Sequence, residues 1–265
     1  MNIYVELTRA FNAGGLVAVL SSGQAVVLHR LAVMSKDGDW ILRETGDALE
    51  HVLSVLDARN AHYRFGAPLD LQWMRGGWSS HFEFRGEAIR VRTDFVTRPP
   101  RLSPQALAAL WTAQEGHPLP FVGVRELAEL KKTNREKDYV VIGELARLLT
   151  DPQDQLLFSR SARDIIALAE QHPALIKTLV ARRPVLISAA KGLEDLEAAL
   201  DAERRQLIHA NEHRLHRYLL AAERWRAMWP VVAQEIEGMP LGEAHRIVVE
   251  RASDALPEQP EMGEP

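Results

Sequence analysis

Cysteine is missing from all 265 residues of the chain. Its absence excludes disulfides, thiolate metal sites and cysteine nucleophiles, and it is compatible with the reducing cytosol. The first residues show no basic stretch followed by an apolar one, as a secretory signal would. Long apolar runs are also missing, since the best two, at 16–20 and 25–28, fall far short of the roughly 20 residues of a membrane span. We therefore expect a cytoplasmic protein with no membrane partner.

A strong excess of either charge is missing too. The chain has 32 Lys and Arg residues against 36 Asp and Glu residues, a net charge of −4. This balance argues against a protein that coats nucleic acid or binds membranes through a basic surface, although it permits a small local patch. Apolar residues make up 46% of the chain, which is enough for a sizeable core and excludes intrinsic disorder.

Two textures divide the sequence. Residues 15–100 mix short strand-like runs with turn signals, whereas residues 101–250 are almost wholly helical in pattern. Strands and helices in this order are typical of an α+β (or α/β) fold, with a mixed sheet flanked by helices. We expect this domain over residues 1–150, a mainly helical domain over 151–252, and a disordered, acidic, proline-rich tail over 253–265.

The helical half is punctuated by prolines, which are tolerated in the first turn of a helix but not in its interior. This pattern predicts several separate helices joined by short connections. The expected helices cover 123–149, 154–171, 173–182 and 193–229, with Pro152, Pro173, Pro184 and Pro230 between them.

The sharpest chemical feature is the pair of carboxylates in Asp37-Gly38-Asp39. Two residues apart on a strand, both side chains point to one face. Paired carboxylates suit Mg²⁺, and two such ions can clamp the attacking and leaving oxygens of a phosphoryl transfer. Asp94 offers a third carboxylate, on the strand side opposite Phe95. The alternative is an ordinary hairpin turn at Asp37-Gly38, with Asp94 on a solvated strand face.

Upstream of these carboxylates, Ser22-Gly23 forms a strand-to-helix turn. Backbone N–H groups at a helix N-terminus bind phosphate, and a glycine leaves room for the phosphate to approach. Taken alone, such a turn is common and carries no function.

Together, the three features resemble the DNA-polymerase-β-like nucleotidyltransferase superfamily, which includes minimal and abortive-infection toxin types. Its pattern is a hydrophobic residue before Gly-Gly or Gly-Ser, then Asp-x-Asp, then a later strand with a third Asp. Here Leu20 precedes Ser21-Ser22-Gly23, thirteen residues separate Gly23 from Asp37, and IRVRTDFVTRPP supplies Asp94. The resemblance covers residues 10–150. The segment ELKKTNREKDYVVIGELARL is similar to a helix of bacterial members, at Lys131 or Lys132, Arg135, Lys137 and Asp138.

The resemblance implies a nucleotidyltransferase-like sheet and a nucleotidyltransferase that uses Mg²⁺ or Mn²⁺. Asp37 and Asp39 would hold the metal and the phosphates of ATP or another NTP, and Asp94 would complete the metal site and help to deprotonate a hydroxyl acceptor. Ser22, Gly23 and Lys132 would bind the nucleotide. The acceptor would be an RNA end, a protein or a small molecule.

Two departures from the pattern favour a second hypothesis. The turn reads Ser-Gly rather than Gly-Ser, and Gly38 stands where members have a hydrophobic residue. The alternative is therefore a catalytically inactive binding or antitoxin-like module of the same fold, with a protein partner on its helical domain. If Asp94 faced away from the other two, Glu83 or Asp70 would be the next carboxylate to consider.

Other candidates have ordinary explanations. His209, His213 and His216 share one stripe of a helix, which is typical of a polar solvent face, although histidines one turn apart can bind zinc. Arg204 and His209 match the spacing of the HEPN-type ribonucleases, a pattern common by chance in an arginine-rich helix. Four aromatic residues near the strands are expected mostly in the core: Trp73, Trp78, Phe82 and Phe84. Of these, Trp78 is the best candidate for an exposed ring that stacks on a base.

Overall fold

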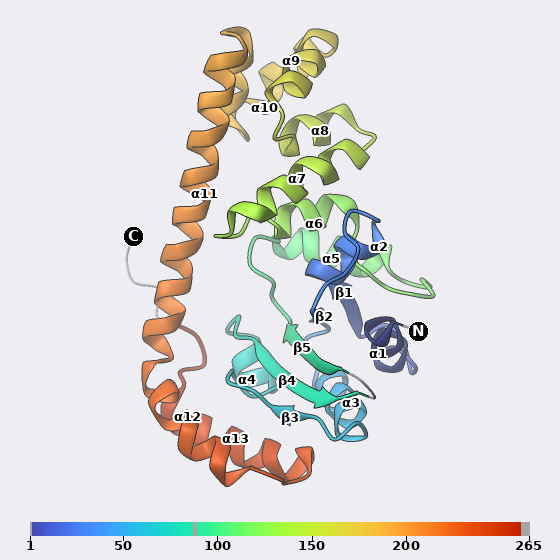
Figure 1. The fold of residues 1–265 in the computed structure, drawn as a ribbon, viewed down its shortest axis with the longest axis vertical. Coiled ribbons are helices and arrows are strands. Elements are labelled where there is room, and N and C mark those ends of the chain that lie inside the picture. Colours follow the sequence, from blue (N-terminus) through green and yellow to red (C-terminus); the bar gives the residue numbers. More distant parts are fainter. Residues whose placement is uncertain (1, 87–88, 261–265) are drawn as a thin grey trace. The chain divides into compact units, whose positions relative to one another are not determined.

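The structure is a computed structural model that describes residues 2–86 and 89–260 (Figure 1). The chain forms two compact units, each described by itself below. The N-terminal part of the first unit ends at Val122, whereas the sequence placed the domain boundary near residue 150. The chain from Leu215 onward belongs to the first unit again. In full, the first unit comprises Met1–Leu28, Ala32–Val122 and Leu215–Pro265, and the second His29–Leu31 and Gly123–Arg214.

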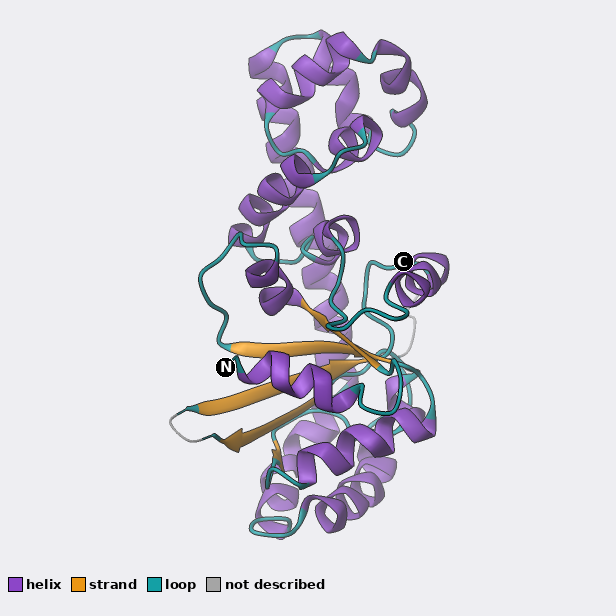
Figure 2. Ribbon diagram, turned by 90° about the vertical axis from the view of Figure 1, so that its right-hand side faces the viewer, coloured by secondary structure: helices purple, strands orange, loops and turns teal. Residues whose placement is uncertain are grey.

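The first unit is built on a five-stranded mixed sheet, drawn in orange in Figure 2, with strand order β1-β2-β5-β4-β3. Strands β2 and β5 run parallel, and the other neighbouring pairs run antiparallel. This sheet and its flanking helices confirm the expected α+β class. The strands are β1 (Ala18–Ser21), β2 (Asp37–Leu42), β3 (His62–Tyr63), β4 (Ser80–Arg85) and β5 (Arg90–Val96).

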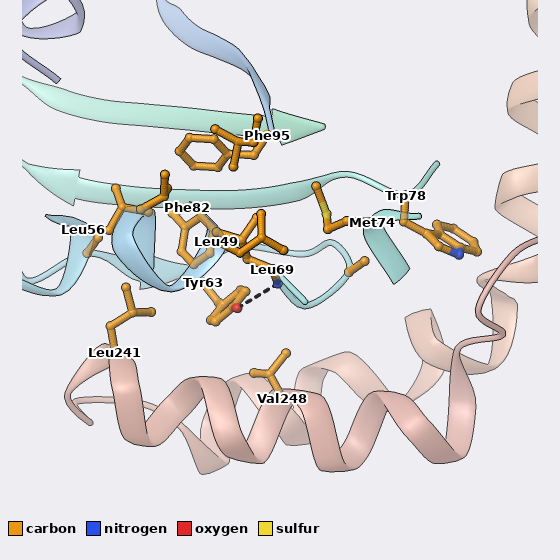
Figure 3. Close-up of a cluster of buried hydrophobic side chains, with 14 of the residues drawn as sticks. Leu49, Leu56, Tyr63, Leu69, Met74, Trp78, Phe82, Phe95, Leu241 and Val248 are labelled. Carbon is orange, nitrogen blue, oxygen red and sulfur yellow. Dashed lines mark hydrogen bonds between the residues drawn. The ribbon is translucent and has the colours of Figure 1, made fainter. Parts of the chain in front are cut away.

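Alternation along the strands gives the sheet one apolar face, because side chains of period two share a side. Trp40, Phe82 and Phe95, from three neighbouring strands, are buried, and their rings pack together on this face. Helices α3 and α13 add Leu49, Leu56, Leu241 and Val248 to the same core (Figure 3). The helices of the first unit are α1 (Ile3–Phe11), α2 (Ser22–Leu28), α3 (Gly46–Asp57), α4 (Leu71–Met74), α5 (Pro104–Ala113), α12 (Glu223–Glu235) and α13 (Leu241–Ala255).

The second unit is built of helices around its own small core, which includes Leu156, Ile165 and Leu196. Three of the expected proline boundaries are correct, since the prolines open α8, α10 and the 3₁₀ helix η1. Pro230 is the exception, because it lies inside α12. The helices are α6 (Val124–Leu130), α7 (Glu136–Leu148), α8 (Pro152–Phe158), α9 (Ala162–Gln171), α10 (Pro173–Leu179), η1 (Pro184–Ala190) and α11 (Leu193–Ala221), the last of which ends in the first unit.

The C-terminal segment up to residue 260 is ordered, contrary to the expected disordered tail. Helix α13 continues to Ala255, and Leu256 is buried. Two indole groups fix the chain beyond it, because Trp73 Nε1 donates to Leu256 O and Trp78 Nε1 donates to Pro257 O, each at 3.0 Å. Residues 261–265 lie outside the described part. Within that part, no helix has the length and apolar character needed to cross a membrane.

Candidate functional site

The polar face of the sheet carries the two carboxylates of β2. Asp37 and Asp39 are partly exposed, whereas Gly38, which lies between them, and Trp40, which follows, are buried. This alternation places both carboxylates on the side away from the core. The hairpin alternative for Asp37-Gly38 is therefore wrong, because these residues pair with β5 in a regular ladder.

Asp94 lies on the same face as the β2 carboxylates. It is the parallel partner of Asp39, and its neighbours Thr93 and Phe95 are buried. Adjacent strands lie about 4.8 Å apart, so the two aspartates are lateral neighbours. The pKa of the Tyr4 hydroxyl is raised, first by burial of the side chain and then by the negative charges of all three carboxylates. The sequence prediction that the three aspartates share one side is thus met by the backbone.

The side chains of these aspartates are engaged differently. Asp94 Oδ1 lies 2.7 Å from His81 Nδ1 and 3.4 Å from Arg64 Nη1. Asp37 Oδ1 is buried without a hydrogen-bond partner among the described residues, and its ion-pair contact is Arg92 Nη1 at 3.9 Å. As the side chains lie, no group of three His, Cys, Asp or Glu residues in the described chain is close enough together to hold a metal. We expected all three carboxylates to lie within one coordination sphere, and in these side-chain positions they do not.

The donor set nevertheless fits a hard cation. Asp37 and Asp39 offer carboxylate oxygens on one strand, which are the ligands Mg²⁺ prefers. A buried carboxylate oxygen without a hydrogen-bond donor costs free energy that a cation would recover. Asp94 would need to exchange its contact with His81 or Arg64 to join them.

Tyr4 of helix α1 supports β2 from the core side, a role that the sequence pattern did not predict. Its hydroxyl donates to Lys36 O at 2.5 Å, at the start of the strand that carries Asp37. A Cβ built on Gly38 would lie 2.5 Å from Tyr4 Cδ1 and 2.4 Å from Trp40 Cη2, both too close for real atoms. Gly38 therefore leaves room for two aromatic rings beneath the carboxylates. The signal in the sequence was the spacing of Tyr4, Leu7 and Phe11 on the buried face of α1.

The Ser22-Gly23 turn leads from β1 into α2, as expected from the sequence. Ser21, the last residue of β1, is the antiparallel partner of Asp39, so the turn begins beside the carboxylates. Ser22 adopts φ 50°, in the left-handed region that non-glycine residues rarely occupy. Gly23 has a second reason to be glycine, because a Cβ there would collide with the Ser35 side chain. The predicted approach of a phosphate to this residue stays a prediction.

We expect Gly23→Ala to destabilise the first unit by about 1–3 kcal/mol, the usual cost of overpacking. Shortening Ser35 to glycine in the same chain should recover most of that loss, because it removes the atoms that the new Cβ meets. Urea unfolding of the two single variants and the double variant measures this coupling. If Gly23→Ala costs the same with and without Ser35, the collision is not the reason for the glycine.

His81 and Glu83 on β4 complete the polar face. The sequence offered Glu83 as the carboxylate to consider if Asp94 faced away, whereas His81 was missed. His81 and Glu83 are the register partners of Asp94 and Arg92. The His81 ring is held at both nitrogens, since Nε2 lies 2.9 Å from Ser79 Oγ. Glu83 is largely buried, and hydrogen bonds from Arg90 and His62 outweigh burial, so that its pKa is lowered. Strand alternation could have shown that His81 and Glu83 share one side of their strand, opposite Phe82, but not which residues of β5 they pair with.

Lys132 lies in the second unit, and its predicted role toward a nucleotide stays a prediction. Its Nζ donates to Glu129 Oε2 at 2.7 Å and stands over the Phe158 ring. The neighbouring Lys131 is buried and paired with Asp138, which also accepts from Thr133. In the motif around residues 131–138, Lys131 therefore supports the local structure and Lys132 is the more accessible lysine.

The other candidates have local explanations. Trp78 is 8% exposed and packs against Tyr218, so it is not an exposed stacking platform. Asp70 caps α4 by accepting from Gln72 N, and Trp73, Phe82 and Phe84 are core residues as expected. The three histidines of α11, His209, His213 and His216, are exposed, and His209 Nε2 and His213 Nε2 lie 3.1 Å apart. Arg204, the partner of His209 in the ribonuclease-like spacing, forms an ion pair with Asp201.

Comparison with known proteins gives a limited result. No protein-family model and no curated protein matches the sequence. Among solved structures, the chain is similar to a candidate nucleotidyltransferase from H. pylori, with 12% identity, a TM-score of 0.39, and coverage of 80% of this chain and 96% of that one. JHP933 from Helicobacter pylori is similar with 13% identity, a TM-score of 0.37, and coverage of 81% and 94%. Similarity this low assigns no activity, so the residues of the site must carry the function.

Proposed function

We propose that the protein is a Mg²⁺-dependent nucleotidyltransferase, which moves a nucleoside monophosphate from an NTP to a hydroxyl acceptor and releases pyrophosphate. The observation that carries the proposal is the placement of Asp37, Asp39 and Asp94 on one face of two parallel neighbouring strands. The Ser22-Gly23 turn begins directly beside them on β1. This arrangement follows the superfamily pattern that the sequence resembles.

Each residue has a distinct part in the proposed reaction. Asp37 and Asp39 would hold the metal, which when bound neutralises charge on the phosphates. Asp94 would accept the proton of the acceptor hydroxyl as its oxygen bonds to the α-phosphorus. The bond from the α-phosphorus to the bridging oxygen breaks at the same time, and pyrophosphate leaves with that electron pair. The turn would bind the phosphates.

A second candidate function is a nucleotidyltransferase-like module without catalysis, acting as a binding or antitoxin-like protein. The contacts of Asp94 with His81 and Arg64 favour it, because a carboxylate held this way is not free to act as a metal ligand or base. The two functions differ in what Mg²⁺ and NTP do to the protein.

We expect Mg²⁺ with an NTP to raise the thermal midpoint of the wild-type protein. At a hundred times Kd, the stabilisation is about 2.7 kcal/mol by mass action. Asp37→Asn should remove most of this shift, because it deletes a charged ligand with little change of volume. Asp47→Asn, an exposed aspartate in the first turn of α3, is the matched control and should retain the shift.

Two results would count against the proposal. If none of the four NTPs shifts the wild-type midpoint with Mg²⁺ or Mn²⁺, the protein is the binding module. If the shift survives Asp37→Asn, nucleotide binds elsewhere and the site is wrong.

A further inference from the structure

The single negative charge of Glu83 is surrounded by three arginine side chains and a histidine. Its largely buried carboxylate accepts from Arg90 Nε at 2.8 Å and lies 3.1 Å from His62 Nε2. Arg64 Nε and Arg92 Nε stand 3.7 and 3.9 Å away. The side chains of Arg64, Arg90 and Arg92 are 31%, 61% and 41% exposed, whereas the side chain of Glu83, their common partner, is 9% exposed. We call Arg64, Arg90 and Arg92 the arginine cluster.

The arginine cluster is short of anions once the two aspartates beside it bind a metal or take part in catalysis. Three guanidinium groups share the one charge of Glu83, which leaves two positive charges. The other nearby acids are Asp94, 3.4 Å from Arg64, and Asp37, 3.9 Å from Arg92. Both are carboxylates that the proposed function assigns to metal binding or catalysis. With those carboxylates engaged, the arginines would need anions from a ligand.

The arginine cluster lies across the aspartates from the Ser22-Gly23 turn. In the strand order β1-β2-β5-β4-β3, the turn follows β1, the aspartates lie on β2 and β5, and the arginines lie on β5 and just beyond β3. In phosphoryl transfer the attacking and leaving oxygens are roughly in line on opposite sides of the phosphorus. If pyrophosphate leaves on the side of the turn, the acceptor approaches from the side of the arginines.

We propose that the arginine cluster binds the backbone phosphates of a single-stranded nucleic acid whose terminal hydroxyl is the acceptor. The inference rests on the proposed function and names its acceptor class. Guanidinium groups match phosphate with two parallel hydrogen bonds. Arg90 and Arg92 are two residues apart on one strand, about 6.6 Å, so a ligand with anions repeated along its length can reach both. A strand with a terminal hydroxyl supplies the reacting group and the repeated anions together.

The test is the binding of a fluorescent single-stranded RNA of about 12 nucleotides, within the usual range of site sizes, measured by anisotropy with Mg²⁺ present and without NTP. We expect Arg90→Gln/Arg92→Gln to weaken binding at least about fivefold. The slope of log K against log salt should fall by about 0.7 for each phosphate that the variant no longer neutralises. Arg98→Gln is the matched control, since Arg98 is 56% exposed and holds Glu44 through two hydrogen bonds, as Arg90 holds Glu83. It should leave RNA binding unchanged.

A second measurement does not depend on the variants folding. RNA that carries a photoreactive base should crosslink to wild-type peptides that contain residues 62–64 or 80–92. Crosslinks confined to other peptides would overturn the proposal.

Further outcomes separate this proposal from the proposed function. A wild-type protein that shows the Mg²⁺–NTP thermal shift but binds no RNA refutes the nucleic-acid acceptor and leaves the nucleotidyltransferase standing. Arginine-dependent binding of a serine-containing polyglutamate peptide, as tight as that of RNA, would refute it in favour of a protein acceptor. Equal binding of a mononucleotide and the RNA would refute the strand and indicate a single phosphate. Absence of the thermal shift refutes the proposed function itself, and this acceptor with it.

Discussion

Gly38→Val should destabilise the first unit by about 3 kcal/mol or more, at the upper end of what overpacking costs. The position is buried, and a Cβ there would overlap the Tyr4 and Trp40 rings, neither of which can move away, since Trp40 also stacks on Phe95. Tyr4 is held in turn by its hydrogen bond to Lys36 O. The variant should also displace the carboxylates on either side of Gly38.

Tryptophan fluorescence in urea measures this loss in the first unit alone, because all six tryptophans lie in its segments. Gly46→Ala is the matched control: it lies at the start of α3, and a Cβ there meets nothing within 4 Å. It should be neutral or slightly stabilising. A Gly38→Val protein as stable as wild type would show that the rings do not occupy this space.

Glu203→Gln should destabilise the second unit by about 3–5 kcal/mol, the cost of breaking a buried ion pair from one side. Glu203 accepts from Arg183 Nε at 3.0 Å and also from Arg160. Arg183 is 5% exposed and would keep its charge with only neutral acceptors, which are Leu156 O, Ser159 O and the new amide oxygen. Far-UV circular dichroism reports the loss, since the unit is helical.

Glu144→Gln is the control, because Glu144 is 48% exposed and pairs with Arg147 on the surface. It should cost less than about 1 kcal/mol. Burial acts to raise the pKa of Glu203, but Arg183 and Arg160 outweigh it, so that the pKa is lowered. A lowered folded-state pKa gives stability that is present above the ordinary glutamate range and is lost as pH falls through the folded-state value. The gap between wild type and Glu203→Gln should therefore narrow in acid. A gap that is constant with pH would contradict this assignment.

The sequence was sufficient for the strands that carry the site. Alternation within each strand predicted that Asp37 and Asp39 share a side and that Asp94 lies opposite Phe95, because strand period is local information. The turn after β1 was likewise predicted correctly. These features depend on neighbours in the chain and not on distant contacts.

The parts that could not be predicted depend on residues far apart in sequence. Gly38 departs from the superfamily pattern, and the reason is Tyr4, 34 positions earlier, whose ring occupies the space that a side chain at position 38 would need. The His81–Asp94 contact requires the β4–β5 register. The order of the C-terminal segment depends on Trp73 and Trp78, whose indoles bind carbonyls more than 170 residues later. Composition alone pointed to a disordered tail.

The most direct test of the central claim is to follow label from the α-phosphate of an NTP into an acceptor in a cell extract, with Mg²⁺ present. Label at the α-position follows nucleotidyl transfer, whereas label at the γ-position would follow kinase activity. The wild-type protein should transfer α-label and release unlabelled pyrophosphate, Asp37→Asn should reduce that transfer at least about a hundredfold, the lower end of what removing one transition-state-stabilising group costs, and Asp47→Asn should leave it unchanged. Transfer of γ-label instead, or α-label transfer that persists in Asp37→Asn, would contradict the assignment of this face as a nucleotidyltransferase site.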